Sequence, residues 1–310
     1  MIQDIYPKKL NNSFYDYKIS GDDTVFIFDK DGKSLVKDDN GQMLFAIGDD
    51  ILSVSESGEH GKDVIYLFSI DDKRYFLYLE CGCTSDNQHA SFEPNTKNSS
   101  AGKGFDPAAM LTAKGFDFYG IREIRDRFAG EEVFAVFIAY HLWRWYADNH
   151  FCGRCGSGLL PDKSERALRC PDCGNIVYPR INPAVIVGVT RGDELLITRY
   201  NRGYAHNALV AGFTEIGETL EETVAREVME ETGVKVKNIR YYKSQPWGMA
   251  QDILVGFFCD AEGDGKITMD KNELKYAEWV KREDIVLQPN SLSLTNEMMR
   301  VFKTEGEMNP

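Results

Sequence analysis

Seven of the 23 residues from Gly212 to Val234 are glutamates, and this stretch is the part of the chain best suited to chemistry. Glu227, Glu230 and Glu231 are spaced i, i+3 and i+4, so an α-helix would carry their carboxylates on one face. Glu-rich helices are usually solvated faces, but like charges this close also favour a bound cation. Mg²⁺ and similar ions take oxygen ligands and are commonly shared between carboxylates and substrate phosphates. The spacing therefore points to phosphate chemistry.

The element that must position these carboxylates is a helix with its own start and stop signals. Thr219 is a candidate N-cap, Glu222 three positions later completes a capping box, and Gly233 provides the C-terminal stop. We expect the buried side of this helix to be formed by Val224, Val228 and Met229. A helix with both ends defined fixes the face on which the glutamates lie.

The whole stretch resembles the Nudix box, the sequence motif of Nudix hydrolases. Every fixed position of that motif is filled, by Gly212, Glu218, Arg226, Glu227, Val228, Glu230, Glu231, Gly233 and Val234. The resemblance implies a loop, helix and loop on an α/β/α sandwich that cleaves a nucleoside diphosphate linked to another moiety. It also implies that Glu227, Glu230 and Glu231 bind the catalytic Mg²⁺ or Mn²⁺.

The chemistry of a pyrophosphate suggests roles for the remaining charged residues of the box. A pyrophosphate repels hydroxide, so its hydrolysis requires neutralised phosphoryl oxygens and an activated water. Glu218 lies eight residues before Arg226, and a charge-assisted contact between them would hold the loop against the helix. We interpret this pair as a scaffold that aims the ligands. The base is either Glu230 or Glu231, and the sequence does not choose between them.

Four cysteines form a second motif with a recognisable spacing. Cys152 and Cys155 make one CxxC, Cys170 and Cys173 make another, and 14 residues separate the two pairs. This spacing is typical of a four-thiolate zinc site, which supports folding and performs no catalysis. The alternatives are disulfides or a redox pair. The chain begins MIQDIYPKKL, which does not resemble a secretory signal, so we expect a reducing cytoplasmic location and a structural zinc ion.

The order of these motifs resembles the NADH pyrophosphatase branch of Nudix hydrolases, in which a zinc ribbon directly precedes the Nudix domain. The linking segment YPRINPAVIVGV at residues 178–189 is also close to that branch. The resemblance implies hydrolysis of NAD(H), or of a related dinucleotide, to NMN(H) and AMP by a homodimer. Some members of the branch remove NAD caps from RNA 5′ ends. The alternative is a Nudix hydrolase for another substrate, such as ADP-ribose, a nucleotide sugar or a dinucleoside polyphosphate.

A segment after the box departs from this branch and bears on the substrate. The branch has Ser, Gln, Pro, Trp, Pro, Phe, Pro, any residue and Ser at these positions, a loop associated with recognising NADH. Residues 244–247 match this pattern, whereas Gly248, Met249, Ala250 and Asp252 depart from it. We take Gln245, Trp247 and Asp252 as candidate substrate contacts. The structural alternative is that this loop packs at a dimer interface.

Four further positions are carried over from the resemblance one at a time. Phe213 and Tyr178 match aromatic residues that stack on a base, although an aromatic ring of this kind alone more often belongs to the core. Glu273 matches a further acidic metal ligand, with a length difference of one residue in the preceding turn. Ser293 stands where the branch usually has a small alanine beside the nucleotide.

The charge balance limits the partners of this protein. The chain has 49 acidic and 36 basic residues, a net charge of −13, and this excess repels phosphate backbones. We therefore expect no DNA partner, although an RNA end can still bind locally. A non-catalytic RNA-binding protein is the hypothesis from another class, and the complete carboxylate set counts against it. The longest apolar run, AVIVGV, is too short for a membrane span, so we expect no membrane partner.

The remaining sequence predicts an α+β multidomain chain: an N-terminal β-rich domain with a polar connecting loop (1–118), a helical segment (119–149), a zinc ribbon (150–178) and a Nudix α/β/α sandwich (179–310). Alternating apolar runs between residues 22 and 80 indicate antiparallel strands. Residues 85–115 are polar and predict a loop. Residues 131–148 predict a helix whose broad apolar stripe forms either core or a dimer seam.

Overall fold

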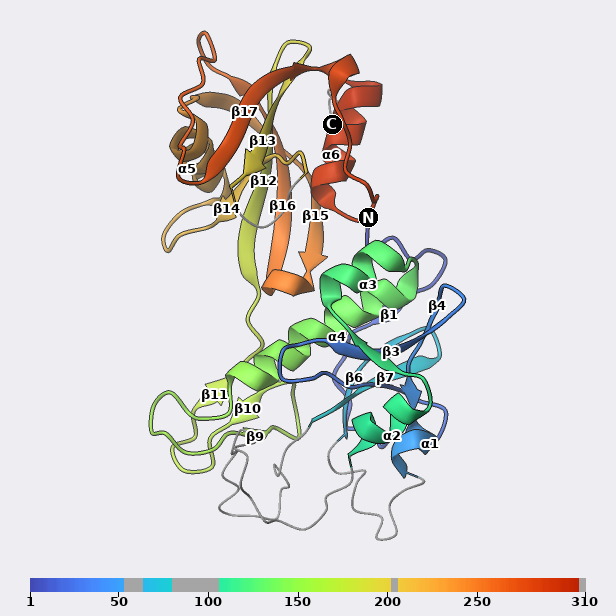
Figure 1. Ribbon diagram of the computed structural model, residues 1–310. Coiled ribbons are helices and arrows are strands. Elements are labelled where there is room, and N and C mark those ends of the chain that lie inside the picture. The colour runs from blue at the N-terminus through green and yellow to red at the C-terminus, as the bar shows by residue number, and fades with distance from the viewer. Residues whose placement is uncertain (53–63, 80–105, 202–205, 307–310) are drawn as a thin grey trace. The chain divides into compact units, whose positions relative to one another are not determined.

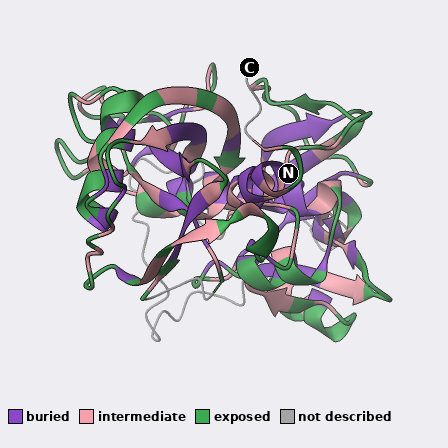
Figure 2. Cartoon of the chain, turned by 90° about the horizontal axis from the view of Figure 1, so that it is seen from above, coloured by how far each residue is buried: buried purple, intermediate pink, exposed green. Residues whose placement is uncertain are grey.

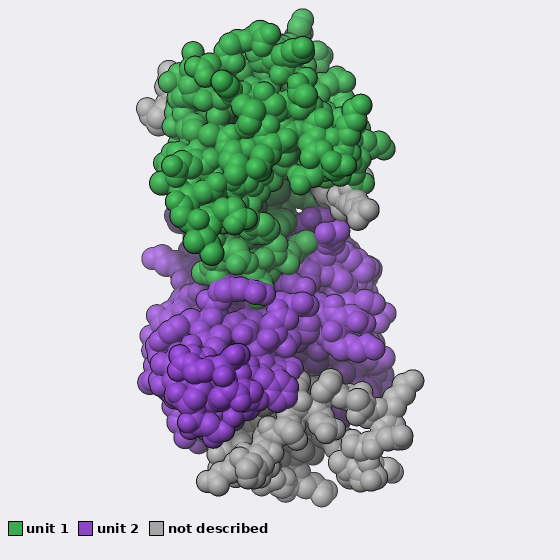
Figure 3. Space-filling view, turned by 90° about the vertical axis from the view of Figure 1, so that its left-hand side faces the viewer, with its two compact units in different colours: residues 1–4, 181–310 green, residues 5–180 purple. Residues whose placement is uncertain are grey.

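The computed structural model describes residues 1–52, 64–79, 106–201 and 206–306. The chain divides into two compact units, shown in different colours in Figure 3. The first unit contains Met1–Asp4 together with Ile181–Pro310, and the second contains Ile5–Arg180. No helix in the described ranges combines the length and apolar character that a membrane crossing requires.

The second unit is built on a five-stranded sheet. Its strands follow the order β1 (Leu10–Asn11), β6 (Val64–Ile70), β7 (Lys73–Tyr78), β2 (Thr24–Phe26) and β5 (Ala46–Ile47). The prediction of antiparallel strands is wrong for one pair, because β2 and β7 are parallel, with Thr24 opposite Tyr75. Long chain segments separate these two strands, and only a tight hairpin forces neighbours to be antiparallel. A smaller sheet follows the order β4 (Gln42–Leu44), β3 (Ser34–Asp39) and β8 (Asp117–Tyr119).

The predicted loop at residues 85–115 is wrong over its last part. A helix, α2 (Pro107–Ala113), begins at Asp106, whose side chain accepts a hydrogen bond from the backbone N–H of Ala109. Proline in the first helical turn and buried Leu111 stabilise it further. The residues of this prediction before 106 lie outside the described ranges. Two short helices, α1 (Gly48–Leu52) and α3 (Ile121–Arg127), complete this part of the unit.

The helix predicted over residues 131–148 is confirmed as α4 (Glu131–Asp148). Val133, Phe137 and Trp145 are buried within the second unit, so the apolar stripe is core. The ribbon follows as three short antiparallel strands, β9 (Leu160–Pro161), β10 (Leu168–Arg169) and β11 (Ile176–Val177).

The first unit is an α/β/α sandwich, as expected (Figure 1). Its mixed sheet contains β12 (Asn182–Arg191), β13 (Glu194–Tyr200), β14 (Val210–Phe213), β15 (Val236–Trp247), β16 (Asp252–Ala261) and β17 (Leu274–Lys281). Helix α5 (Leu220–Thr232) packs on one face through Val224 and Val228, and α6 (Leu294–Glu305) packs on the other through Met298 and Phe302. Buried residues are concentrated in the strands between these helices (Figure 2). Two short 3₁₀ turns, η2 (Gly248–Ala250) and η3 (Arg282–Asp284), follow β15 and β17.

Helix α5 has the ends that the sequence predicts. Thr219 and Glu222 form a capping box, and Gly233 ends the helix in the left-handed region at φ 70°. The predicted burial of Met229 is wrong, because this side chain is 38% exposed. Met229 follows the buried Val228 by one residue, and a step of about 100° around the helix turns it away from the core.

The first residues of the chain belong to the sandwich. Ile2 is buried, and its backbone N–H donates a hydrogen bond to the carbonyl oxygen of Leu292 at 3.0 Å. The side-chain amide of Gln3 donates to the carbonyl oxygen of Ser244 in β15 at 3.2 Å. These contacts attach the N-terminal segment to β15 and to the residues before α6.

Candidate active site and zinc centre

The four cysteines of the ribbon converge on one point. Their sulfur atoms all lie within 4.8 Å of one another, with Cys152 and Cys173 3.6 Å apart and Cys155 and Cys170 3.4 Å apart. A tetrahedral zinc ion with Zn–S bonds of about 2.3 Å requires sulfur atoms about 3.8 Å apart. The geometry and the all-thiol donor set therefore fit zinc and leave no position open for a substrate.

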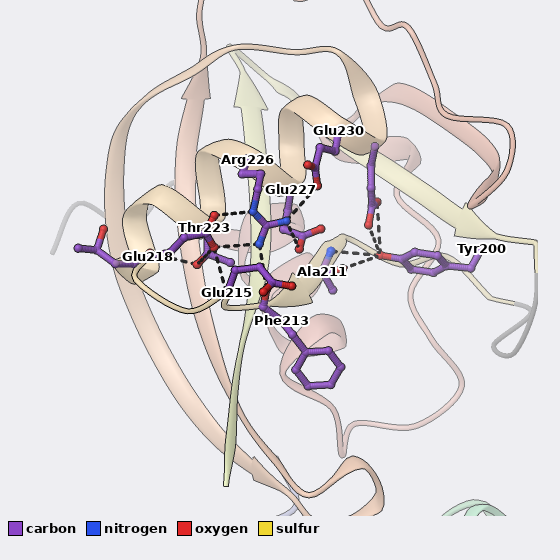
Figure 4. Close-up of polar contacts among 11 residues, drawn as sticks. Tyr200, Ala211, Phe213, Glu215, Glu218, Thr223, Arg226, Glu227 and Glu230 are labelled. Carbon is purple, nitrogen blue, oxygen red and sulfur yellow. Dashed lines mark hydrogen bonds and ion pairs between the residues drawn. The ribbon is translucent and has the colours of Figure 1, made fainter.

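Arg226 is the centre of the polar network on α5 (Figure 4). Its guanidinium forms a bidentate pair with Glu218, through Nε–Oε1 at 2.6 Å and Nη2–Oε2 at 2.9 Å. This contact confirms the expected pairing of the two residues. Nη2 also donates to the carbonyl oxygen of Phe213 at 3.0 Å, which ties the end of β14 to the helix. The Arg226 guanidinium and the backbone N–H of Glu215 lower the pKa of Glu218 to about 2.

The same arginine also holds two of the candidate metal ligands, a contact that sequence reasoning missed. Its Nη1 donates to Glu227 Oε1 at 2.8 Å and to Glu230 Oε2 at 2.9 Å. Gly212 makes room for this arrangement, because a Cβ atom at that position would lie 2.0 Å from the Glu227 carboxyl carbon. Burial raises the pKa of Glu227, with Arg226 acting against this and the charges of Glu230 and Glu273 adding to it.

Glu231 lies on the buried side of the cluster and has a different partner. It is 2% exposed, and it accepts a hydrogen bond from the hydroxyl of Tyr200 at 3.1 Å. Burial raises the pKa of Glu231 to about 8, and the negative charges of Glu227 and Glu273 contribute to this. Tyr200 was not a candidate from the sequence, because it lies 31 residues from Glu231 and belongs to no motif.

Glu273 completes the set of four carboxylates. It directly precedes β17, and its carbonyl oxygen accepts a hydrogen bond from the backbone N–H of Asn201 at 2.9 Å. Its side chain is exposed, and its charge acts on both Glu227 and Glu231. The fold therefore brings Glu273 to the box although more than 40 residues separate it from Glu231.

The candidate substrate contacts differ in exposure. Phe213, at the end of β14, is 49% exposed, and Trp247 is half-buried. Gln245 is fully buried: its amide nitrogen donates to Gln3 and to the Leu292 carbonyl, and its amide oxygen accepts from the Leu294 N–H. The structure therefore brings Phe213 and Trp247 to the surface of the sandwich but keeps Gln245 inside it.

Ser293 acts as the N-cap of α6. Its hydroxyl accepts a hydrogen bond from the N–H of Asn296 at 3.1 Å and donates to Gln288 Oε1 at 2.7 Å. Ser293 and Gln245 therefore both bind the first turn of α6. This shared contact links β15 to the helix.

Asp252, which replaces the serine of the branch, begins β16 between Trp247 of β15 and Asn182 of β12. It is 5% exposed, and burial raises its pKa to about 7. Within the ranges that the structure describes, no hydrogen-bond donor reaches its Oδ1. A buried carboxyl with an unsatisfied oxygen is costly for the fold.

Tyr178 belongs to the second unit, directly after β11. Its ring is 54% exposed, and its hydroxyl donates to Glu165 Oε1 at 3.0 Å. The ring is therefore on the surface of the ribbon and not in its core.

Comparison with known proteins decides the family. The NUDIX domain matches residues 180–301, and the NADH pyrophosphatase zinc ribbon domain matches residues 147–178. The chain is 40% identical over 182 residues to the NAD-capped RNA hydrolase NudC of Salmonella typhi, which covers 58% of this chain and 70% of that relative. The chain belongs to the Nudix hydrolase family. The Nudix box and the ribbon inferred from the sequence are thereby confirmed.

A second curated relative and a solved structure are also similar to this chain. The NAD-capped RNA hydrolase NudC of Enterobacter sp. (strain 638) is 42% identical over 175 residues, covering 56% of this chain and 67% of the relative. Among solved structures, a Nudix hydrolase from Nitrosomonas europaea is 20% identical, with a TM-score of 0.45 and coverage of 50% of this chain and 90% of that one.

The carboxylates of this Nudix domain form a donor set that suits a hard divalent cation. All four groups offer oxygen, which Mg²⁺ and Mn²⁺ prefer, whereas the ribbon offers sulfur, which suits zinc. Burial raises the pKa of both Glu227 and Glu231, and the charge of Glu273 raises both further. The chemistry of these donors therefore fits the catalytic metal that the family uses, while among the described residues it is the ribbon cysteines whose ligand atoms all lie within 4.8 Å of one another.

Proposed function

We propose that this Nudix hydrolase cleaves the pyrophosphate bond of NAD(H), or of a related dinucleotide, to release NMN(H) and AMP. The observation that carries the proposal is the carboxylate cluster of Glu227, Glu230, Glu231 and Glu273, which lies beside the paired Glu218 and Arg226. The ribbon directly before the Nudix domain and the named relatives support a dinucleotide as substrate. The same chemistry acts on an NAD cap at an RNA 5′ end, which the names of these relatives favour.

We assign the roles in this reaction to the chain's own residues. Glu227, Glu230, Glu231 and Glu273 would hold Mg²⁺ or Mn²⁺, which when bound would neutralise phosphoryl oxygens and supply an acidified water. Arg226 orients Glu227 and Glu230, while Glu218 fixes the position of Arg226. The base is Glu230, on the exposed side of the helix, or Glu231, on its buried side.

Substrate binding is proposed to involve residues with two different roles. Phe213 and Trp247 present aromatic surface on which a base or nicotinamide ring can stack. Tyr178 has the same chemistry and an exposed ring. Gln245 and Ser293 act indirectly, because their side chains are engaged in holding the start of α6. Asp252 is also buried, so we assign it an indirect role at the start of β16.

A second candidate function is hydrolysis of another nucleoside diphosphate derivative, such as ADP-ribose. The specific observation in its favour is the turn after Trp247, where Gly248–Ala250 form a 3₁₀ turn in place of a proline-rich loop. Asp252 also places a carboxyl where the branch has a hydroxyl. The changed turn alters the segment that the branch associates with substrate recognition, whereas Asp252 is buried and changes the interior of that segment. The residues of the carboxylate cluster are all present.

The test is a kcat/KM comparison over NADH, NAD⁺, ADP-ribose, FAD, diadenosine polyphosphates and NAD-capped RNA, with Mg²⁺ or Mn²⁺. The proposal requires AMP release from NADH or the capped RNA at a rate above that for ADP-ribose. Glu230→Gln and Glu231→Gln, assayed separately, show which carboxylate is the base. Both variants should retain about one zinc per chain, because the ribbon lies outside the carboxylate cluster.

We further propose a cytoplasmic homodimer. The reducing environment is supported by the four ribbon cysteines, which form a zinc-type cluster and no disulfide. The dimer rests on the resemblance to the NADH pyrophosphatase branch. Sedimentation of the intact chain, at concentrations spanning the range used for kinetics, tests it directly.

A further inference from the structure

Tyr200 connects two elements of the Nudix box through one hydroxyl group (Figure 4). The backbone N–H of Ala211, in β14, donates a hydrogen bond to this hydroxyl at 3.1 Å. The hydroxyl in turn lies 3.1 Å from Oε1 and 3.4 Å from Oε2 of Glu231, in α5. Its single proton can point to the nearer oxygen while its lone pair accepts from Ala211. The result is a hydrogen-bonded chain from the strand backbone to the carboxylate.

The charge of a hydrogen-bond donor affects how well the glutamate that it contacts can bind a metal ion. Arg226 holds Glu227 and Glu230 with a positive charge, which competes with a cation for the same oxygens. The hydroxyl of Tyr200 is neutral, so it can fix the rotamer of Glu231 without adding a positive charge that competes with the ion. Partners of this kind around metal ligands commonly change metal affinity or activity by about 10–100-fold when they are removed.

The backbone around Tyr200 is shaped for this contact. The pairing of β13 with β17 is irregular between Arg199 and Tyr200, so that Tyr200 lies opposite Leu274. Irregularities of this type re-aim a side chain and are frequent beside active sites. The next residue, Asn201, donates its backbone N–H to the carbonyl oxygen of Glu273. The end of β13 therefore contacts two of the four carboxylate residues, Glu231 by side chain and Glu273 by backbone.

We propose that Tyr200 is a positioning residue that orients the Glu231 carboxylate for the catalytic divalent cation. This inference rests on the proposed metal-dependent function of the carboxylate cluster. Tyr200 touches neither the substrate nor the reacting atoms in this assignment. Its contribution is to hold one buried ligand in the conformation that the ion requires.

The direct test is Mn²⁺ binding to the intact protein without substrate, measured by electron paramagnetic resonance of the free ion. Tyr200→Phe removes the hydroxyl and keeps the ring, and we expect it to weaken Mn²⁺ binding about tenfold. The KM for NADH should stay within twofold of the wild-type value at saturating Mn²⁺. The matched control is Tyr242→Phe, whose hydroxyl donates to Glu297 at 3.3 Å, and it should bind Mn²⁺ as the wild type does.

A double-mutant cycle separates positioning from a general effect on folding. In a Glu231→Gln background the ligand charge is gone, so adding Tyr200→Phe should change Mn²⁺ affinity by less than twofold. An equal loss in both backgrounds, or wild-type affinity in the single variant, would overturn the proposal. The proposed activity is tested separately. If the wild type cleaved no pyrophosphate, the activity would be refuted, and the Mn²⁺ binding measurements would still decide the role of Tyr200.

Discussion

The buried carboxyl of Asp252 allows a direct test of how burial of this group changes the stability of the fold. This side chain is 5% exposed at the start of β16, and burial raises its pKa from 3.8 to about 7. Between these two pH values the folded protein holds a proton that the unfolded chain releases. The free energy of unfolding therefore falls as the pH rises from about 4 to about 7, and the full penalty is present above that range.

The size of this penalty follows from the two pKa values. A difference of about three pKa units corresponds to about 4 kcal/mol as an upper bound. Buried sites behave as if their dielectric constant were well above that of dry protein, so we expect about half of this, or about 2 kcal/mol. For a unit of this size, that corresponds to a shift of about 4–8 °C in the melting temperature.

The perturbation is Asp252→Asn, which keeps the shape of the side chain and removes its titration. We expect the variant to melt about 4–8 °C above the wild type at pH 8 and within about 2 °C of it at pH 5, by thermal unfolding followed by circular dichroism. Asp260→Asn is the matched control in the same strand. The Asp260 carboxylate pairs with Arg240 at 2.9 Å and its pKa is lowered, so this substitution should lower the melting temperature at pH 8. A difference between Asp252→Asn and the wild type that did not grow with pH would refute the reasoning.

Three further predictions concern the box and the ribbon. Gly212→Ala would place a Cβ atom 2.0 Å from the Glu227 carboxyl, so we expect kcat for NADH to fall at least about 100-fold with zinc retained, which a kinetic assay and metal analysis can check. The amine of Arg226→Lys cannot reproduce the bidentate contact with Glu218, so we expect about a 10–100-fold loss of kcat/KM. A kcat/KM like that of the wild type would mean that the two parallel hydrogen bonds of the guanidinium are unimportant. Cys152→Ser leaves three thiolates, and we expect loss of bound zinc and a lower melting temperature for the ribbon, measured by metal analysis and calorimetry.

The parts of this molecule that could be predicted from its sequence are those fixed by local spacing. The capping box at Thr219 and the helix end at Gly233 depend on contacts between residues a few positions apart. The spacing of the four cysteines is itself typical of a zinc site. The Glu218 and Arg226 pair is also close in sequence, and its contact is confirmed.

The parts that could not be predicted depend on contacts between distant residues. Tyr200 contacts Glu231 only because the fold brings β13 and α5 together. The pattern of apolar residues along the sequence does not predict this contact. The sequence predicts Gln245 to be a substrate contact in a loop. Its side chain is instead buried and hydrogen-bonded to Gln3 and Leu294, which lie far away in the chain. The parallel pairing of β2 with β7 was missed for the same reason, since alternating apolar residues indicate a strand but not the direction of its neighbour.

The attachment of Ile2 and Gln3 to the sandwich has a consequence for how the protein is made. Ile2 and Gln3 are synthesised well before the groups they bind, at Leu292 and Ser244, because Gln3 and Ser244 are 241 positions apart in the chain. The Nudix unit therefore cannot be completed during translation until Leu292 has been synthesised. A fragment that starts at Ile181 would leave the buried site of Ile2 open and the Gln245 amide without its Gln3 partner. Residues 1–4 therefore complete a unit whose other residues are 181–310.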